Sequence, residues 1–225
     1  MCKTNKYSHG NVHFILALLN AYFQTNMQIS KIEIRDYSKA NVEACRDLCN
    51  ELMKFQAEQS HTGTDVLAAM TFDNRLKPSF ESALLKKLLL AFDGKDAVGY
   101  VYADVSDVAE ERKLFVPEWA KEIYREGQNI FYNSEQKLPA RLGTFNNLYI
   151  KPGYHGLGIG NRLSKIVMDW MKSIERISGI YVYVSNGNER VADFYRKFGF
   201  EYSHDVLGGF IKAYYHNIPL QRLSE

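Results

Sequence analysis

One stretch, KPGYHGLGIGNRL at residues 151–163, constrains the fold of this chain more than any other. It follows GTFNNLYIKP (143–152), a β-strand pattern that ends at a proline, and it precedes apolar residues at helical spacing. Gly156, Gly158 and Gly160 occupy every second position, which is more glycine than a tight connection needs. A glycine-rich turn between a strand and a helix exposes backbone N–H groups in the field of the helix dipole. We therefore expect the loop to bind an anion, with a plain tight turn as the alternative.

Two common phosphate-binding motifs do not fit this loop. A P-loop ends in Gly-Lys-Ser/Thr, whereas Gly160 is followed by Asn161 and Arg162. A Rossmann loop has the spacing G-x-G-x-x-G and an acidic residue at the end of the next strand. Here the spacing is G-x-G-x-G, and the next strand ends in Ser185 and Asn186. The sequence thus favours neither a P-loop kinase nor a Rossmann dehydrogenase.

The helix that follows the loop is predicted to be long and amphipathic. Its expected apolar stripe consists of Leu163, Ile166, Val167, Trp170, Met171, Ile174 and Ile177. We expect Gly179 to end this helix and IYVYV (180–184) to form the next strand.

A second motif, NERVADFYRKFGF (188–200), predicts another short helix. Asn188 is suited to cap it and Gly199 to stop it. Its apolar stripe consists of Val191, Phe194 and Phe198. Asn188 and Tyr195 are seven residues apart, so they share one face of the helix. Nothing structural demands a tyrosine at position 195. Read alone, however, Tyr195 is interpreted as a packing residue of an amphipathic helix.

The order of elements before the loop is also readable. We predict a strand over 29–38, a helix over 40–55, a second helix over 79–87 and a β-hairpin over 88–105. Residues 107–142 break this rhythm, and so long a segment between strands is more often functional than a plain connector.

Residues 1–26 are predicted to be an appendage, a short helix or an extension, and residues 27–225 the domain proper. The apolar run at 12–23 is shorter than the roughly 20 residues that span a bilayer, so we expect no membrane insertion. A role at a membrane surface is the alternative reading of this run.

Composition narrows the class of protein. The 225 residues are 46% hydrophobic, enough for a large core, and the net charge is only +2, so we expect no nucleic-acid partner. Three cysteines cannot form a disulfide framework, which favours a cytoplasmic location. Cys45 and Cys49 lie on the first predicted helix without a second ligand pair, so we expect core thiols and no metal site. A homodimer is left open.

Taken together, LYIKPGYHGLGIGNRL and NERVADFYRKFGF resemble the GCN5-related N-acetyltransferase (GNAT) superfamily. The resemblance is specific over 143–200 and rests on the order of elements alone over 28–105. It implies an α/β fold with a mixed, mostly antiparallel central sheet flanked by helices. Two parallel central strands, 144–150 and 180–184, are expected to splay apart.

The resemblance also implies a cofactor, acetyl-coenzyme A, and residues that hold it. The family loop Gln/Arg-x-x-Gly-x-Gly/Ala, whose backbone amides hold the pyrophosphate, is matched except at its first position by His155, Gly156, Leu157, Gly158, Ile159 and Gly160. Further cofactor contacts are implied for Leu148, Tyr149, Ile150, Asn161 and Asn188. Tyr195 matches the tyrosine that protonates the leaving thiolate, which makes it the implied catalytic residue.

The implied reaction is direct acetyl transfer from the thioester to an amine-bearing small molecule or peptide. Where family members often place a carboxylate, the strand before the loop offers Thr144, Asn146 and Asn147. The proton acceptor therefore stays open between a water chain and three side chains, Glu58, His61 and Asp104. We expect residues 56–80 and 107–142 to form the acceptor side. A non-catalytic acyl-CoA-binding sensor or interaction module is the alternative function.

Overall fold

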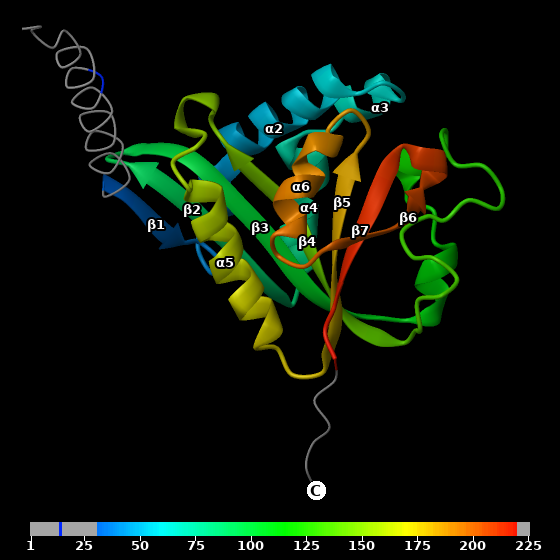
Figure 1. Cartoon of the computed structure of the whole chain (residues 1–225). Coiled ribbons are helices and arrows are strands. Elements are labelled where there is room, and N and C mark those ends of the chain that lie inside the picture. Colours follow the sequence, from blue (N-terminus) through cyan, green and yellow to red (C-terminus); the bar gives the residue numbers. More distant parts are fainter. Residues whose placement is uncertain (1–13, 15–30, 220–225) are drawn as a thin grey trace, which may run out of the picture.

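The computed structural model of the chain describes residue 14 and residues 31–219. The predicted appendage, residues 1–26, lies outside the described residues apart from residue 14. Among the described residues, one seven-stranded sheet has helices on both of its faces (Figure 1). The strand order in space is β1-β2-β3-β4-β5-β7-β6. The strands are β1 (Ile32–Asp36), β2 (Leu85–Asp93), β3 (Asp96–Val108), β4 (Ala140–Ile150), β5 (Ile177–Ser185), β6 (Glu201–Val206) and β7 (Ile211–Asn217).

Five α-helices of the described chain connect or cover these strands. They are α2 (Arg46–Gln59), α3 (Thr64–Ala68), α4 (Lys77–Ser82), α5 (Ile159–Lys172) and α6 (Ala192–Arg196). Shorter turns flank them: η1 (Val42–Cys45), η2 (Phe72–Leu76), η3 (Glu110–Leu114), η4 (Glu118–Ala120), η5 (Pro152–Tyr154), η6 (Glu189–Val191) and η7 (Leu207–Gly209). No helix in residues 31–219 is both long and apolar enough to cross a bilayer.

The sheet is antiparallel throughout except between β4 and β5. These two strands pair in parallel only from Arg141 to Phe145 on β4. Beyond Phe145, β4 continues beside β3 as far as Ile150, whereas β5 continues beside β7 as far as Ser185. The two central strands therefore separate toward their carboxyl ends, and the predicted fold class with its splayed strands is confirmed.

The two faces of the sheet have separate cores. Helices α5 and α6 cover one face, and α2 and α4 cover the other (Figure 1). Leu163, Val167 and Met171 of α5 are fully buried against the first face, as the amphipathic pattern predicts. Cys45 and Cys49 are fully buried under the second face as free thiols, so the prediction of core cysteines is confirmed.

Two predicted helix ends are wrong. The helix predicted over 79–87 ends at Ser82, because Leu85 and the two residues after it pair with β3 as the start of β2. The helix predicted to stop at Gly179 ends at Lys172, and Gly179 lies inside β5. A Cβ at Gly179 would lie 2.0 Å from the Tyr215 hydroxyl oxygen, so this glycine allows a close approach within the sheet instead of ending a helix.

The segment between β3 and β4 spans residues 109–139 and covers part of the sheet beside β5 and β6. Its only regular structure is two short turns, η3 and η4. Side chains of the sheet hold it: Tyr183 donates to the Phe131 carbonyl (3.0 Å), and Tyr181 donates to Gln136 Oε1 (2.7 Å). His204 Nε2 lies 3.1 Å from the Phe131 carbonyl oxygen. The segment is thus a packed cover attached by few polar contacts.

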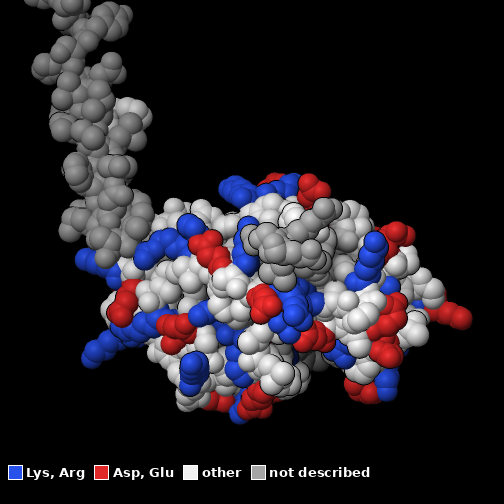
Figure 2. All heavy atoms as spheres, turned by 90° about the horizontal axis from the view of Figure 1, so that it is seen from below, with Lys and Arg blue, Asp and Glu red and all other residues white. Residues whose placement is uncertain are grey.

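Acidic and basic side chains alternate over the surface seen in Figure 2, with no broad region of one sign on that face. This distribution agrees with the near balance of charge in the sequence.

Candidate active site

The glycine loop lies where the sequence predicts it, between β4 and the first turn of α5. Gly156 and Gly158 both have positive φ values, 79° and 73°, which side chains rarely adopt. A Cβ built on either residue would have no atom within 4 Å. Space is therefore open in front of both glycines, which is what a cradle for an anion requires.

The first turn of α5 presents unpaired donors to this space. The first helical hydrogen bond runs from Arg162 N–H to Gly158 O, 3.0 Å. The N–H groups of Ile159, Gly160 and Asn161 precede it, so they have no intrahelical acceptor. No side chain caps this end of the helix. Three backbone donors and the positive end of the helix dipole thus meet at the glycine loop.

His155 does not extend toward this cradle. Its Nε2 lies 2.7 Å from the carbonyl oxygen of Ile150, the last residue of β4. The ring therefore closes the turn back onto the strand in its Nε2–H tautomer. Any contact of His155 with an anion would have to come from its backbone or from a rotated ring.

The backbone of β4 has free hydrogen-bonding edges where it leaves β5. Lys151 N–H donates to Val98 O, 2.9 Å, which fixes the alternation of the antiparallel ladder with β3. By that alternation Tyr149 bonds to β3, whereas the N–H and C=O groups of Leu148 and the N–H of Ile150 point toward the splay, and the Ile150 carbonyl is already bonded to His155. An extended ligand could therefore add to β4 there as a strand does.

Tyr195 lies on α6 beside the same opening. It is only 6% exposed, and its ring packs edge-on against Phe145 of β4, with centroids 5.6 Å apart. Phe194 and Phe200 complete the aromatic surroundings. Burial raises the pKa of the Tyr195 hydroxyl well above its ordinary value. No hydrogen bond joins this hydroxyl to another group within residues 31–219, and the raised pKa keeps it protonated.

Asn188 precedes the short turn η6, but its side chain makes no capping hydrogen bond. The prediction that it caps the helix is therefore wrong. The helix begins with a 3₁₀ turn, Glu189–Val191, whose first residue follows Asn188 directly. The Asn188 side chain is left half-buried and available at the carboxyl end of β5.

A β-bulge lies at the point where the strands separate. Tyr102 opposes Asn147, whereas its neighbour Ala103 opposes Phe145, so Asn146 is the extra residue of β4. The bulge turns Asn146 toward β3, where its Nδ2 donates to Asp104 Oδ2, 2.6 Å. Bulges of this kind re-aim side chains beside active sites.

Two cavities open on the face opposite α5. The larger, about 1050 Å³, runs from α4 along β3 and under the segment 109–139, and Asp104, Thr144 and Asn146 line its floor. The smaller, about 90 Å³, lies between α2, α3 and the splay, and it is lined by Asn147 and Ser185. The predicted position of the acceptor side, at 56–80 and 107–142, agrees with the walls of both cavities.

Two buried polar atoms face the smaller cavity without a partner. Asn147 Oδ1 and Ser185 Oγ make no hydrogen bond within residues 31–219, although each residue is only 5% exposed. Asn147 comes from β4 and Ser185 from β5, on the two sides of the splay. Unpaired buried polar atoms are costly, so their presence here indicates a place for a polar ligand group.

The structure distinguishes the three side chains considered as proton acceptors. Glu58 is exposed and lies 3.8 Å from Lys54 Nζ, and His61 is exposed with its backbone N–H bonded to Asn186. Neither lines a cavity, whereas Asp104 lies on the floor of the larger one. Burial raises the pKa of the Asp104 carboxyl, although hydrogen bonds from Asn146 and Tyr102 partly offset this effect.

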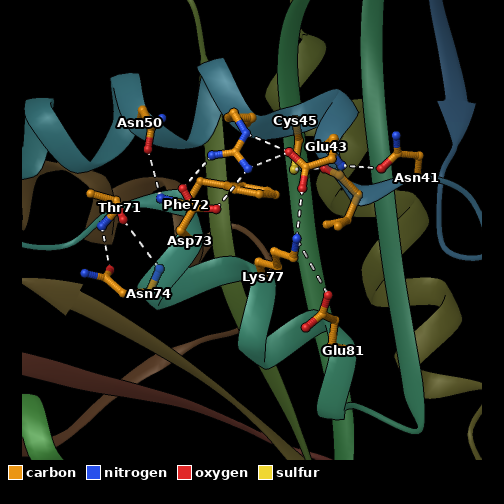
Figure 3. Close-up of polar contacts among 12 residues, drawn as sticks. Asn41, Glu43, Cys45, Asn50, Thr71, Phe72, Asp73, Asn74, Lys77 and Glu81 are labelled. Atoms are coloured by element: carbon orange, nitrogen blue, oxygen red, sulfur yellow. Dashed lines mark hydrogen bonds and ion pairs between the residues drawn. The ribbon is translucent and has the colours of Figure 1, made fainter.

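The wall opposite Asp104 is the segment η2–α4, which carries Arg75 and Ser79. Figure 3 shows how ion pairs fix this segment to the start of α2. Arg46 binds Asp73 through two contacts of 2.6 and 2.9 Å, and Lys77 Nζ lies 3.1 Å from Glu43 Oε1. A capping box between Thr71 and Asn74 starts η2. Sequence reasoning missed η2 as a helical turn, although a threonine three residues before an amide is its signal.

No group of three or more His, Cys, Asp or Glu side chains in the described part of the chain is arranged to hold a metal ion.

Comparison with known proteins identifies a related family over most of the chain. The sequence profile described as "Acetyltransferase (GNAT) family" matches residues 47–200. This range includes both motifs, the segment 109–139 and all the residues that line the two cavities except Ile211.

A curated relative and several solved structures are also similar. Spermidine N(1)-acetyltransferase of Escherichia coli K12 is 31% identical over 71 residues, which is 31% of this chain and 38% of the relative. The chain therefore matches less than half the length of that relative.

Solved structures share the fold at low identity. A PaiA N-acetyltransferase from Thermoplasma acidophilum, in complex with coenzyme A, superposes with a TM-score of 0.54 at 18% identity, covering 83% of this chain and 99% of that one. NAA60 of Arabidopsis thaliana, in complex with acetyl-CoA, gives 0.51 at 17% identity, with 83% and 99% covered.

Proposed function

The chain belongs to the acetyltransferase (GNAT) family, and from this premise we propose that it moves an acetyl group from acetyl-CoA directly to a primary amine. The single observation that carries the proposal is the continuity of two features. An open glycine cradle with unpaired N–H donors is followed, back along the unpaired part of β4, by the place where β4 leaves β5. There Tyr195 packs against Phe145 on one face of the sheet, and the two cavities open on the other.

The residues present fit acetyl-CoA. The open space before Gly156 and Gly158 suits a pyrophosphate, and the backbone groups of Leu148 and the N–H of Ile150 suit the amides of a pantetheine arm. The orphaned Asn147 Oδ1 and Ser185 Oγ give polar partners at the far end of the splay. Related folds have been crystallised with coenzyme A and with acetyl-CoA, which supports the same cosubstrate here.

We assign Tyr195 the role of general acid. When bound, acetyl-CoA supplies an activated acyl carbon and a thiolate leaving group. The acceptor nitrogen forms a bond to that carbon as the carbon–sulfur bond breaks, and Tyr195 donates its proton to the departing sulfur. The raised pKa keeps the tyrosine protonated between turnovers. Cys45 of η1 and Cys49 of α2 are fully buried in the core between α2 and the sheet, so neither of these cysteines supports a covalent acyl-enzyme.

The acceptor is an amine that enters from the cavity face of the sheet, opposite α5. The match to a spermidine acetyltransferase supports an amine acceptor, but it covers too little of either chain to name the acceptor. The aromatic ring of Tyr195 packs as a core residue does, so packing alone also accounts for its burial. Turnover experiments separate these two roles.

Release of free thiol from acetyl-CoA tests the function directly. We expect release that depends on an added amine, from a panel of amino acids, polyamines, other amines and peptides. Binding of acetyl-CoA by calorimetry is measured alongside. Binding without amine-dependent release on any acceptor would instead support a non-catalytic acyl-CoA-binding module, and no binding would overturn the proposal.

A further inference from the structure

The charged side chains that line the larger cavity fall into three pairs. Asp107 and Arg141 neutralise each other through two contacts of 2.7 and 2.8 Å. Glu111 and Arg112 are exposed on η3, at the outer rim. Asp104 and Arg75 lie on the inner wall, and neither has an ion-pair partner within 4.0 Å among residues 31–219. The inner cavity therefore presents one uncompensated negative charge and one uncompensated positive charge.

Asp104 is placed to receive an amine. It lies on β3 opposite Thr144 of β4, one strand spacing of roughly 4.8 Å from the strand that leaves β5. Asn146, the bulge residue, donates to Oδ2 at 2.6 Å, and Tyr102 approaches the same oxygen at 3.4 Å. Both of these contacts come from neutral donors, so neither neutralises the carboxylate as a bound cation would.

Arg75 lies across from Asp104 and close to the splay. It is the only charged residue that lines both the larger and the smaller cavity, within the described chain. Its positive charge acts on Asp104, where it opposes the rise in the carboxyl pKa that burial causes. Because both side chains line the larger cavity and do not bond to each other, one small molecule bound there can contact both.

The remaining inner wall is aromatic. Trp119 and Phe131 line both cavities, and their rings are 6.3 Å apart at an interplanar angle of 65°. Phe131 also packs edge-on against Tyr183 of β5, with centroids 5.7 Å apart. Such a wall suits a large apolar or aromatic side chain.

We propose that the acceptor is a free amino acid with a large apolar or aromatic side chain. Its amine binds Asp104, its carboxylate binds Arg75, and its side chain packs against Trp119 and Phe131. The inference rests on the proposed acetyl transfer. Asp104 takes a proton from the bound ammonium group, the freed nitrogen bonds to the acyl carbon, and the carbon–sulfur bond breaks as described above. An uncompensated arginine beside the reacting amine disfavours a polyamine, because the second ammonium group would lie against it.

The test compares three acceptors that have the same aromatic ring and differ in the group beside the amine. Phenylalanine, phenylalaninamide and phenethylamine share the aromatic side chain but differ in having a carboxylate, a neutral amide or neither. Alanine and spermidine complete the set. Thiol release gives kcat/KM for each acceptor. The values are calculated from the concentration of the unprotonated amine and then compared between acceptors. We expect phenylalanine to exceed phenylalaninamide and phenethylamine by roughly 10- to 100-fold, the range of one charge-assisted hydrogen-bonded contact.

Variants assign that preference to Arg75. Arg75→Gln should lower kcat/KM for phenylalanine by the same factor and change phenylalaninamide by less than about threefold, because the lost contact is to the carboxylate alone. Arg75→Lys should keep part of the preference, since it keeps the charge. Arg35→Gln, the same change on the outer strand β1, serves as the matched control and should change neither rate. Circular dichroism of each variant checks the fold.

Equal or better use of phenylalaninamide, phenethylamine or spermidine would overturn the amino-acid acceptor while leaving acetyl transfer intact. Absence of release with all five acceptors would also overturn it. In that case, acetyl-CoA binding and release with peptides decide whether the acetyltransferase function itself survives. A phenylalanine preference that persists in Arg75→Gln would overturn the role of Arg75 as the carboxylate receptor.

Discussion

The proposed cofactor region and the proposed acceptor region of this molecule are built in different ways. The cofactor region is nearly continuous in sequence: β4, the glycine loop and the start of α5 follow one another within residues 140–163. It offers mainly backbone N–H and C=O groups. The acceptor cavity takes its walls from α4, β3, the segment 109–139, β4 and β5, and it offers side chains. A backbone site needs only local conformation, whereas a side-chain site needs the whole fold to bring its members together.

A sequence motif is therefore more informative about a backbone site than about a site made of side chains. Glycines at alternate positions report an open cradle because the missing Cβ atoms are the feature itself. Asp104 has no such local signature. It becomes a cavity residue through the register of β3 with β4 and the bulge that turns Asn146 onto it.

The largest expected effect tests the backbone site. Gly158→Asp adds a side chain and a negative charge to the open space where the phosphates should bind, so we expect acetyl-CoA binding to be lost while the protein stays folded. Calorimetry measures the affinity. Gly127→Asp is the matched control, since Gly127 also has a positive φ (82°) and open space but lies in the segment 109–139. Unchanged affinity in Gly158→Asp would contradict the proposal that the pyrophosphate binds at this loop.

Tyr195→Phe is expected to have the next largest effect, at the boundary between the two regions. The change keeps the ring among Phe145, Phe194 and Phe200 and removes only the hydroxyl. If the hydroxyl protonates the thiolate, the turnover number should fall by roughly 10²-fold, with little change in cofactor affinity.

A thioester with a more acidic leaving thiol gives the internal control for this variant. Such a thiolate needs less protonation, so the defect of Tyr195→Phe should shrink. Normal turnover in the variant, on an amine that the native chain acetylates, would return Tyr195 to a packing role.

A third, smaller effect concerns the pH dependence of the acceptor region. A proton acceptor works when it is deprotonated, so kcat/KM should fall as the pH drops through the raised pKa of Asp104. The facing tyrosines, Tyr102, Tyr132 and Tyr183, have raised pKa values and stay neutral in this range.

In Asp104→Asn we expect kcat/KM near neutral pH to fall by at least roughly 10-fold, and the step in its acid limb to disappear. The remaining slope then reflects protonation of the acceptor amine alone. The profile is measured from pH 5 to pH 9 with one acceptor, and Asp107→Asn, at a paired carboxylate of the same cavity, is the control. An unchanged acid limb in Asp104→Asn would exclude Asp104 as the proton acceptor.

The smallest effect concerns how firmly the cover of the acceptor cavity is held. His204 is 7% exposed, and burial lowers its pKa. Its Nε2–H donates to the Phe131 carbonyl and its Nδ1 accepts from Ser203, so the neutral ring is the form that fits. The folded state binds fewer protons than the unfolded state, so stability is full above the unfolded pKa of about 6.5 and is lost as pH falls below it.

Thermal unfolding at pH 7 and pH 5.5 checks this expectation. We expect a Tm lower by a few degrees at pH 5.5, and a smaller decrease in His204→Gln, which keeps a donor for the Phe131 carbonyl. His216, whose pKa burial also lowers, contributes in the same direction and remains in the variant. An equal decrease in both proteins would show that His204 does not couple the cover to pH.

The sequence by itself determined the features that depend on local conformation. The strand, glycine loop and helix order, the β-hairpin at Asp93 and Gly94, and the buried stripe of α5 could all be read from spacing. They depend on φ preferences and hydrophobic periodicity, which act over a few residues. The loop also indicated the family, because the positions of its glycines in the sequence largely determine its backbone conformation.

The roles of several other residues depend on tertiary contacts and could not be predicted from the sequence. Gly179 reads as a helix stop but serves to let the Tyr215 hydroxyl approach β5, a contact 36 positions away along the chain. Leu85 and its neighbours read as helix but pair with β3. Asp104 is a better candidate for the proton acceptor than Glu58 or His61, because the strand register places it on a cavity floor. Each outcome depends on pairing between distant segments, and no local propensity records which segments will meet.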